Sequence, residues 1–300
     1  MSNPAVSIFS RVLQVKESTF NSLPASASMN TVPFTDCSLS LDITKVVDNT
    51  IQGDAMHRYV VPTTQKVAGT IAGEMSFGNM DWIFEGMSYG TFTSNVVTSG
   101  IVQNSYSIEV GSLDIGQYFL YTGCVIDKLA LTFAPAGIVT YKADFIGAAA
   151  NANTSSHATT VNAAPQNQPM STVNATIKEG GSVVGYITGG TISMDRKHTP
   201  NYPLGNAEPV SITTSFFDIT GTLDVFLEDE VMYNKFVNNS NSSVDWTLTD
   251  GTNTYEITLP RVFYTTAAKD VKGTGPVIMK MNFTAVHDST ANTVMTVTRS

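Results

Sequence analysis

Charged side chains are scarce in this 300-residue sequence. They make up 14% of the residues, against the ~25% that is usual for soluble domains. The 16 lysines and arginines are outnumbered by 25 aspartates and glutamates, which gives a formal net charge of −9. Such a chain is poorly suited to hold nucleic acid through phosphate contacts. The serine, threonine, asparagine and glycine that replace charge favour sheet over helix.

Long apolar runs and cysteines are also lacking. No stretch approaches the ~20 consecutive apolar residues that cross a bilayer, and Arg11, Lys16 and Glu17 stand where a secretory signal would be apolar. We therefore expect a soluble, unprocessed chain with no membrane partner. The two cysteines are Cys37 and Cys124. A core of this size needs no disulfide, so we expect free thiols, and one bridge remains the alternative.

The common signatures of catalytic and metal sites are absent as well. The four histidines have no metal-ligand spacing among them: His57, His157, His198 and His287. No zinc-protease, serine-hydrolase, phosphate-loop or dinucleotide-binding motif occurs. The acidic runs are typical of a helix start and of solvated loops, and the ionisable group at Asp195–His198 is interpreted as a contact or surface patch. We expect no enzymatic activity and no cofactor.

Alternating apolar and polar residues predict antiparallel strands separated by glycine, aspartate and proline. In the first half the predicted strands are Ser38–Ile43, Val67–Phe77, Ser105–Val110, Tyr118–Ile126, Leu129–Phe133 and Ile138–Phe145. In the second half they are Thr191–Arg196, a pair within Val210–Phe226, Val244–Thr249, Tyr255–Tyr264 and Val277–Val286. Two short helices are predicted, Asn79–Met87 with Asn79 as its cap, and Glu228–Asn238.

The order of elements in the first half recurs in the second, which predicts two tandem β domains. We place an N-terminal arm at 1–35, the first domain at 36–150, a linker at 151–181 and the second domain at 182–300. The linker segment has no periodicity and contains prolines.

Three weak sequence matches support a duplication. Ile71–Phe77 matches Ile219–Val225 at an offset of 148, and Gly137–Ile146 matches Gly275–Thr284 at an offset of 138. Ser38–Lys45 resembles Gly190–Lys197. The three matches follow one order along the chain, which favours duplication over chance.

Four ordered motifs carry a resemblance to a known family. They are Lys16-Glu-Ser-Thr-Phe-Asn-Ser-Leu-Pro24, the Ser38–Lys45 strand, Gly69-Thr-Ile-Ala-Gly-Glu-Met-Ser-Phe77 before the first helix, and Tyr121-Thr-Gly-Cys-Val-Ile-Asp-Lys-Leu129 before Gly137–Gly147. Over essentially the whole chain, this set resembles the major tail tube proteins of long-tailed, non-contractile bacteriophages. The resemblance implies an all-β fold with short helices. Each of two tandem tail-tube-type β-sandwich units would have a flanking helix and would form part of a large β-barrel in the assembled ring.

The resemblance also implies a function. The chain is expected to be a structural virion protein that polymerises as stacked rings into the tail tube, the conduit for genomic DNA ejection. Because six-fold rings are usual in such tails, a chain with two units predicts a ring of three with pseudo-six-fold symmetry. The implied partners are the tape-measure protein, the tail terminator and the distal tail or baseplate proteins, with assembly in the host bacterial cytoplasm. A β-sandwich receptor-binding or adhesin module remains the alternative.

Two sets of residues are candidates for assembly. Val46–Pro62 and Lys197–Pro209 are too long for tight turns, and we expect them to reach the adjacent ring with help from the arm Ile8–Leu23. The candidate stacking contacts are Ile51, Met56, Arg58, Tyr59, Tyr202 and Leu204. An acidic channel would repel DNA and keep its adhesion low. The candidate acidic residues of the lumen are Glu74, Glu109, Asp224 and Glu256.

Overall fold

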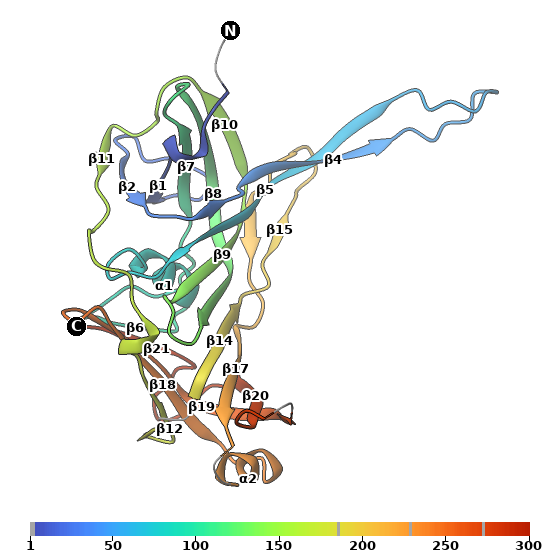
Figure 1. Cartoon of the computed structure of the whole chain (residues 1–300). Coiled ribbons are helices and arrows are strands. Elements are labelled where there is room, and N and C mark those ends of the chain that lie inside the picture. The colour runs from blue at the N-terminus through green and yellow to red at the C-terminus, as the bar shows by residue number, and fades with distance from the viewer. Residues whose placement is uncertain (1–3, 185–186, 228–229, 272–273) are drawn as a thin grey trace.

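β-Strands make up most of the chain, and two short helices accompany them (Figure 1). The computed structural model describes residues 4–184, 187–227, 230–271 and 274–300. The sheets do not close into a barrel. In the part of the chain that is described, no helix has the length and apolar character needed to cross a membrane. The prediction of an all-β fold with short helices is confirmed.

The strands and helices follow one another along the chain in three groups. The first half contains η1 (Ser7–Phe9), β1 (Ser10–Lys16), β2 (Ser28–Val32), β3 (Asp36–Cys37), β4 (Ser40–Val47), β5 (Val60–Glu74), α1 (Asp81–Ser88), β6 (Val96–Thr98), β7 (Tyr106–Ser112), β8 (Gln117–Phe133) and β9 (Thr140–Gly147). The next segment contains β10 (Ala149–Asn153), β11 (Thr160–Asn162), η2 (Thr172–Asn174), β12 (Thr176–Glu179) and β13 (Ser182–Val183). The second half contains β14 (Ile187–Asp195), β15 (Thr199–Asn201), β16 (Ser211–Thr213), β17 (Asp218–Phe226), α2 (Val231–Val237), β18 (Ser242–Thr249), β19 (Thr254–Asp270), β20 (Ile278–Ala285) and β21 (Thr296–Arg299).

Two local predictions need correction. The runs predicted as two strands, Tyr118–Ile126 and Leu129–Phe133, form the single strand β8, which continues through a bulge against β9. Asn79 does not cap α1, because the cap residue is Met80. The Asn79 side-chain amide instead donates to Ser76 Oγ at 2.8 Å and to the Pro165 carbonyl oxygen at 3.1 Å. The two residues before Glu230, at the predicted start of the second helix, lie outside the described residues.

The segments predicted as arm and linker are built into the sheets. Within the predicted arm, β1 lies between β2 and β7 and pairs with both. Within the predicted linker, β10 pairs with β8, β11 pairs with β2, and β12 pairs with β18. The chain between the halves is therefore an ordered strap that adds strands to both of them.

The two halves share one order of strand pairing. In the first half the antiparallel order is β4–β5–β9–β8–β7, and in the second it is β14–β17–β20–β19–β18. The register of β8 on β9 shifts between Ile126 and Lys128, and that of β19 on β20 shifts between Tyr264 and Thr266, which is 138 residues later. In both halves a helix follows the second strand of this order.

Strand register revises two of the sequence matches. In the first half, Ile71 lies opposite Ala143. The counterpart of Ala143 at an offset of 138 is Met281, and the residue opposite Met281 is Leu223. The offset from β5 to β17 is therefore 152, and the predicted value of 148 is wrong. Leu41 lies opposite Val67 and Met194 opposite Ile219, which sets the offset from β4 to β14 at 153. This alignment places Leu39-Ser-Leu-Asp42 over Ile192-Ser-Met-Asp195.

The halves join through a strand pair and a shared core. The second half of β8 pairs with β14, with Leu131 opposite Ile192. One cluster of buried side chains includes residues from both halves. Within it the rings of Phe133 and Trp246 stack at 6.0 Å, and Tyr255 lies 5.1 Å from Phe77. The molecule is therefore packed as one body across the predicted domain boundary.

The first motif of the resemblance meets the fourth around a buried carboxylate. Glu17 is 7% exposed. Its oxygens accept hydrogen bonds from the Asn21 and Gly123 N–H groups and from the Ser105 and Ser107 hydroxyls, at 2.7 to 2.9 Å. Gly123 has φ +66, and a Cβ there would lie 3.1 Å from the Phe20 ring. These motif residues thus fix the turn after β1 against β8, and burial of the charge is compensated by donors.

Candidate assembly surfaces

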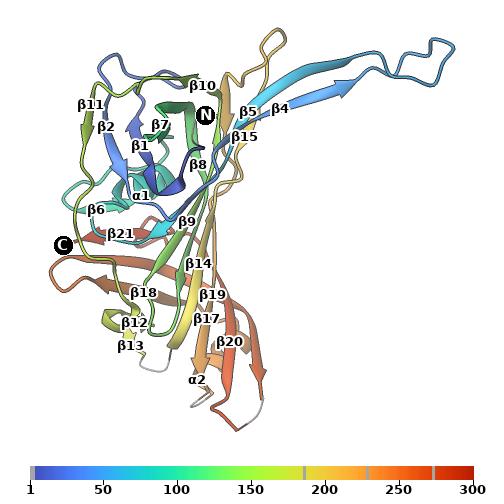
Figure 2. The ribbon, with the colours of Figure 1, turned by 45° about the horizontal axis from the view of Figure 1, so that its top comes forward.

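The β4–β5 hairpin forms a long arm that leaves the body of the molecule (Figures 1 and 2). Only the ends of the segment predicted as irregular, Val46–Pro62, belong to its strands, because β4 ends at Val47 and β5 begins at Val60. Beyond these pairs, the tip carries exposed side chains: Ile51 at 92%, Met56 at 65% and Tyr59 at 66%. We call residues 42–66 the first arm. It presents apolar surface that its own chain does not cover.

Local hydrogen bonds shape the tip of the first arm. Asp48 Oδ1 accepts from the N–H of Thr50 at 2.9 Å and from its hydroxyl at 2.5 Å. These bonds from Thr50 hold the pKa of Asp48 below its usual value. Arg58 pairs with Asp54, and the Asp48 N–H donates to the Tyr59 carbonyl oxygen at 2.9 Å. The predicted contact residue Arg58 is therefore engaged within the tip itself.

The β15–β16 hairpin forms a second, shorter arm. Its strands follow β14 and precede β17, and they pair with each other, with Thr199 opposite Thr213. The second arm thus extends the β14–β17 pair, as the outer parts of β4 and β5 extend their pair beyond the bulge at Ile43 and Lys45. Leu204 is fully exposed at its tip, whereas Tyr202 is half-buried. The Gln65 N–H donates to the Ala207 carbonyl oxygen at 2.8 Å, and the Gln65 amide donates to Glu208 Oε1 at 3.0 Å. The second arm thus leans on the base of the first, and the views of Figures 1 and 2 agree on this.

The four acidic lumen candidates do not share one surface. Glu74 on β5 and Asp224 on β17 lie on the sheet that crosses both halves, with Glu74 exposed and Asp224 half-buried. Glu256 lies on the first half of β19, which pairs with β18 and β21 rather than β20. Glu109 is 1% exposed and accepts from the Ser156 hydroxyl and the His157 N–H, both at 2.6 Å. Glu109 is therefore a wrong choice for an exposed charge, because its carboxylate is held inside the chain.

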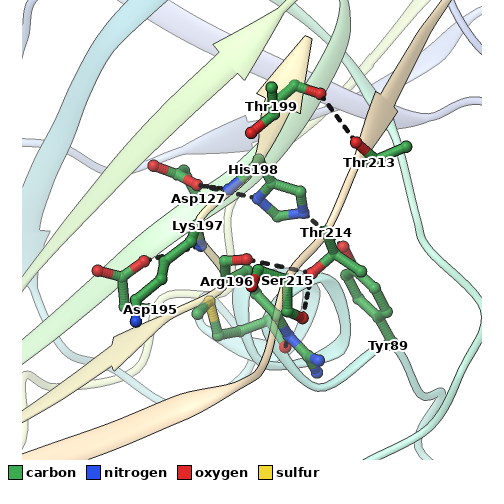
Figure 3. Close-up of polar contacts among 11 residues, drawn as sticks. Tyr89, Asp127, Asp195, Arg196, Lys197, His198, Thr199, Thr213, Thr214 and Ser215 are labelled. Atoms are coloured by element: carbon green, nitrogen blue, oxygen red, sulfur yellow. Dashed lines mark hydrogen bonds and ion pairs between the residues drawn. The ribbon is translucent and has the colours of Figure 1, made fainter. Parts of the chain in front are cut away.

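The ionisable group at Asp195–His198, whose polar contacts are drawn in Figure 3, divides between surface and interior. Lys197 is exposed and pairs with Asp218. The His198 side chain is fully buried, with its Nδ1 3.0 Å from Asp127 Oδ1 and its Nε2 against the Tyr89 hydroxyl. The interpretation as a contact applies to His198, which joins the end of β14 to residues of the first half.

Arg196 completes this junction between the halves. Its guanidinium lies 3.7 Å from the centre of the Phe217 ring and 4.1 Å from that of Tyr89. Its Nε donates to the Met87 carbonyl oxygen at 2.8 Å, and burial lowers its pKa to about 10. Burial works to raise the pKa of Asp127, but hydrogen bonds from His198 outweigh it, so this pKa is lowered. The network stabilises the β8–β14 pair.

The described residues contain no group of three histidine, cysteine, aspartate or glutamate side chains that could hold a metal ion. Cys37 and Cys124 are both free thiols, and burial raises the pKa of each. The expectation of free thiols is confirmed. The surfaces that stand out are sheet edges, arms and a polar sheet face.

Comparison with known families agrees with these features. A family model described as phage tail tube protein matches residues 10–285. A search of the curated proteins finds no match to this chain.

Proposed function

The chain belongs to the phage tail tube protein family, and on that premise we propose that it polymerises as stacked rings into the conduit for genomic DNA ejection. As a member of this family it is a structural component of the virion tail. The proposal further holds that the two halves are copies of one tube unit. The shared pairing order and the coincident bulges support a duplication.

The observation that carries the ring proposal is the β8–β14 pair. Inside the chain, Lys128 of the first half lies opposite Asp195 of the second. At an offset of 138 the counterpart of Lys128 in the second half is Thr266, and at an offset of 153 the counterpart of Asp195 in the first half is Asp42. Among the described residues, Thr266 and its successors in β19 pair with β20 alone, and β4 pairs with β5 alone.

Open strand edges invite pairing with another chain, and closure into a ring removes them. We propose that the end of β19 in one chain pairs with β4 of the next, as β8 pairs with β14. Three chains would then present six equivalent units and close a ring with pseudo-six-fold symmetry. Within each chain the second arm already lies on the first arm. This contact supports a ring in which successive units follow one another in the same direction.

The arms supply the contacts between rings. Repeated contacts of one ring on the next are heterologous and generate an open filament. The exposed residues Ile51, Met56 and Tyr59 suit a neighbour's apolar surface, and Leu204 offers a smaller contact on the second arm. Arg58 and Tyr202 remain proposed contacts with part of their surface already used within the chain.

The polar face of the sheet that crosses both halves is the proposed lumen. On it, Asp144 lies opposite Lys128 and Asp224 opposite Lys280. Short threonine and serine side chains fill the intervening positions of β14 and β17, and the other face of the sheet packs on the core. A lining whose lysines are balanced by carboxylates would not hold DNA by releasing its counterions. Glu74 and Asp224 are its proposed acidic residues.

Other tail components are the proposed partners. A tube needs a protein that sets its length and proteins that end it, so we propose contacts with the tape-measure protein, the tail terminator and the distal tail or baseplate proteins. Genomic DNA passes without specific binding, and assembly takes place in the host cytoplasm.

Negative-stain microscopy of the purified chain tests the proposal. The tube function predicts stacked rings or long hollow fibres. A receptor-binding or adhesin module would give discrete monomers or single trimers, and that result at every concentration and salt tested would overturn the proposal.

A further inference from the structure

A segment before β12 clasps the end of the β8–β9 hairpin. Thr172 Oγ1 accepts from the Gly137 N–H at 3.0 Å, and the Thr172 N–H donates to the Gly137 carbonyl oxygen at 2.9 Å. Met170 bridges the ends of β5 and β9, because its N–H donates to the Met75 carbonyl oxygen and its own carbonyl oxygen accepts from the Val139 N–H. Met75, Val139 and Met170 are all fully buried. The strap between the halves thus covers an otherwise open end of the first half.

The N-terminal segment has the same design as this clasp. η2 and β12 follow each other as η1 and β1 do, and β12 lies on β18 as β1 lies on β7. An offset of 165 aligns the sequences of the two 3-10 helices, so that Pro4 corresponds to Pro169 and Ser7 corresponds to Thr172. Residues 4–9 are nevertheless exposed, with Ile8 at 82% and Phe9 at 54%.

The segment is held in place at one side only. The Val6 N–H donates to Asp114 Oδ2 at 2.7 Å, and the Leu113 N–H donates to the Phe9 carbonyl oxygen at 3.1 Å. These bonds fix residues 4–9 on the β7–β8 turn while their apolar side chains face solvent. A fixed segment loses less entropy on binding than a free one.

The surface equivalent to the clasped end lies on the β19–β20 hairpin. The Leu227 N–H donates to the Val277 carbonyl oxygen at 3.0 Å, as the Met75 N–H donates to Val139 at 2.8 Å. Leu227 is 41% exposed and Val271 is 71% exposed, whereas Met75 and Val139 are fully buried. A Cβ at Gly275 would meet nothing within 4 Å. In the described residues, this end therefore has no cover like that of the first half.

We propose that Pro4–Phe9 of one chain docks on Leu227, Val271 and Val277 of the neighbouring chain, as the segment before β12 docks within the chain. This inference rests on the ring proposed above and assigns the occupant of one of its interfaces. In the docked state Ser7 bonds to Gly275, and the backbone of Ala5 lies between Leu227 and Val277. The apolar side chains of both partners leave solvent together.

Pro276 is compatible with this docking. It corresponds to Ile138, which forms a β-bridge with Ser171. The hydrogen bonds of that bridge are donated by Thr172 and Val139, so the N–H of Ile138 is not required. A proline, which lacks this N–H, can therefore occupy the position.

Paired cysteines test the docking. Val6→Cys and Pro276→Cys combined should form a disulfide between chains after assembly, giving covalent dimers and trimers on a non-reducing gel. The matched control, Ile138→Cys with Ser171→Cys, should close within the chain and run as a monomer. Each single variant of the first pair should give no ladder.

The outcomes separate this inference from the ring itself. If tubes form and the control pair closes, but the Val6 and Pro276 pair gives no covalent multimer, the docking is wrong and the tube function stands. If no rings form under any condition for the unmodified chain, the proposed function fails first. A second measurement needs no variant: assembly should slow amide exchange in residues 4–10, and unchanged exchange in assembled tubes would also overturn the docking.

Discussion

The two halves of the chain share their strand pairing but differ in what covers it. Helix α1 buries six of its eight residues, whereas α2 buries Met232 and leaves Tyr233 and Val237 exposed. The first half has β14 on the edge of β8 and a clasp over the ends of β5 and β9. The second half lacks both within the described residues. The first half is completed by β14 and by the strap, so the difference supports the place proposed for a neighbouring chain.

The largest expected effect separates the two arms. Deleting Asn49–His57 should leave a folded β protein that does not form fibres, because the exposed tip of the first arm is removed while the strand pairs at its base remain. Deleting Pro203–Asn206 from the second arm should reduce fibre length without abolishing fibres. Circular dichroism checks the fold and electron microscopy the fibres. Fibres of normal length after the first deletion would refute the stacking role.

A second effect concerns stability and the equivalence of the halves. Gly69 and Gly221 occupy matching positions at an offset of 152, opposite Phe145 and Phe283. A Cβ at Gly221 would lie 2.3 Å from the Phe283 ring, and one at Gly69 would lie 2.5 Å from the Ser38 carbonyl oxygen. Either glycine changed to alanine should lower the free energy of unfolding by about 1–3 kcal/mol through overpacking.

The matched control for these glycines is Gly275→Ala in the unassembled chain, where a Cβ meets no atom. Its unfolding free energy should change by no more than ~0.5 kcal/mol. Urea denaturation measures all three variants. Equal stability of the Gly221 and Gly275 variants would show that the sheet is looser than the contacts indicate.

A smaller effect is expected at the junction between the halves. The pKa of Asp127 is lowered in the folded chain, so its stabilisation is present above the unfolded pKa of ~3.9 and is lost as pH falls through the folded value. Asp127→Asn should cost about 1 kcal/mol of unfolding free energy at neutral pH, and the difference from the wild type should vanish in acid. Denaturation at several pH values measures this.

Asp218→Asn serves as the control for the junction, because the Asp218 side chain is 43% exposed and pairs with Lys197 at the surface. Its effect should stay below ~0.5 kcal/mol. A pH-independent loss in the Asp127 variant would mean that its carboxylate charge contributes nothing.

The smallest expected effect concerns the lumen. Glu74→Lys combined with Asp224→Lys should leave the chain folded and able to form tubes, yet slow DNA ejection by adding positive charge to the channel. Because screening weakens at low salt, the delay should be greatest there. Ejection kinetics of virions carrying the variant measure the effect. A delay that grows with salt would contradict the electrostatic explanation.

Strand positions could be predicted from alternation, but strand register could not. The error at β5 was a shift of four residues, from an offset of 148 to 152, and an even shift keeps every side chain on its predicted face. The alternating pattern therefore cannot reveal a shift of four residues. The register is known only from the structure, in which Ile71 pairs with Ala143 and Leu223 pairs with Met281. The matching bulges then align the two halves.

The parts that escaped prediction lack alternation or depend on distant residues. All three residues of β11 are exposed, so they carry no pattern that distinguishes a strand from a linker. Glu109 stands on an alternating strand, yet its partners Ser156 and His157 come from the strap 47 and 48 residues away. The exposed tips of the arms, by contrast, were predictable, because Ile51 and Met56 lie in a segment too long for a turn.

A reconstruction of the assembled tube tests the central claim most directly. It should show three chains in each ring, with the end of β19 in one chain paired to β4 of the next as β8 pairs to β14. A ring of six chains, with residues 182–300 placed on the outside of the tube, would contradict the account.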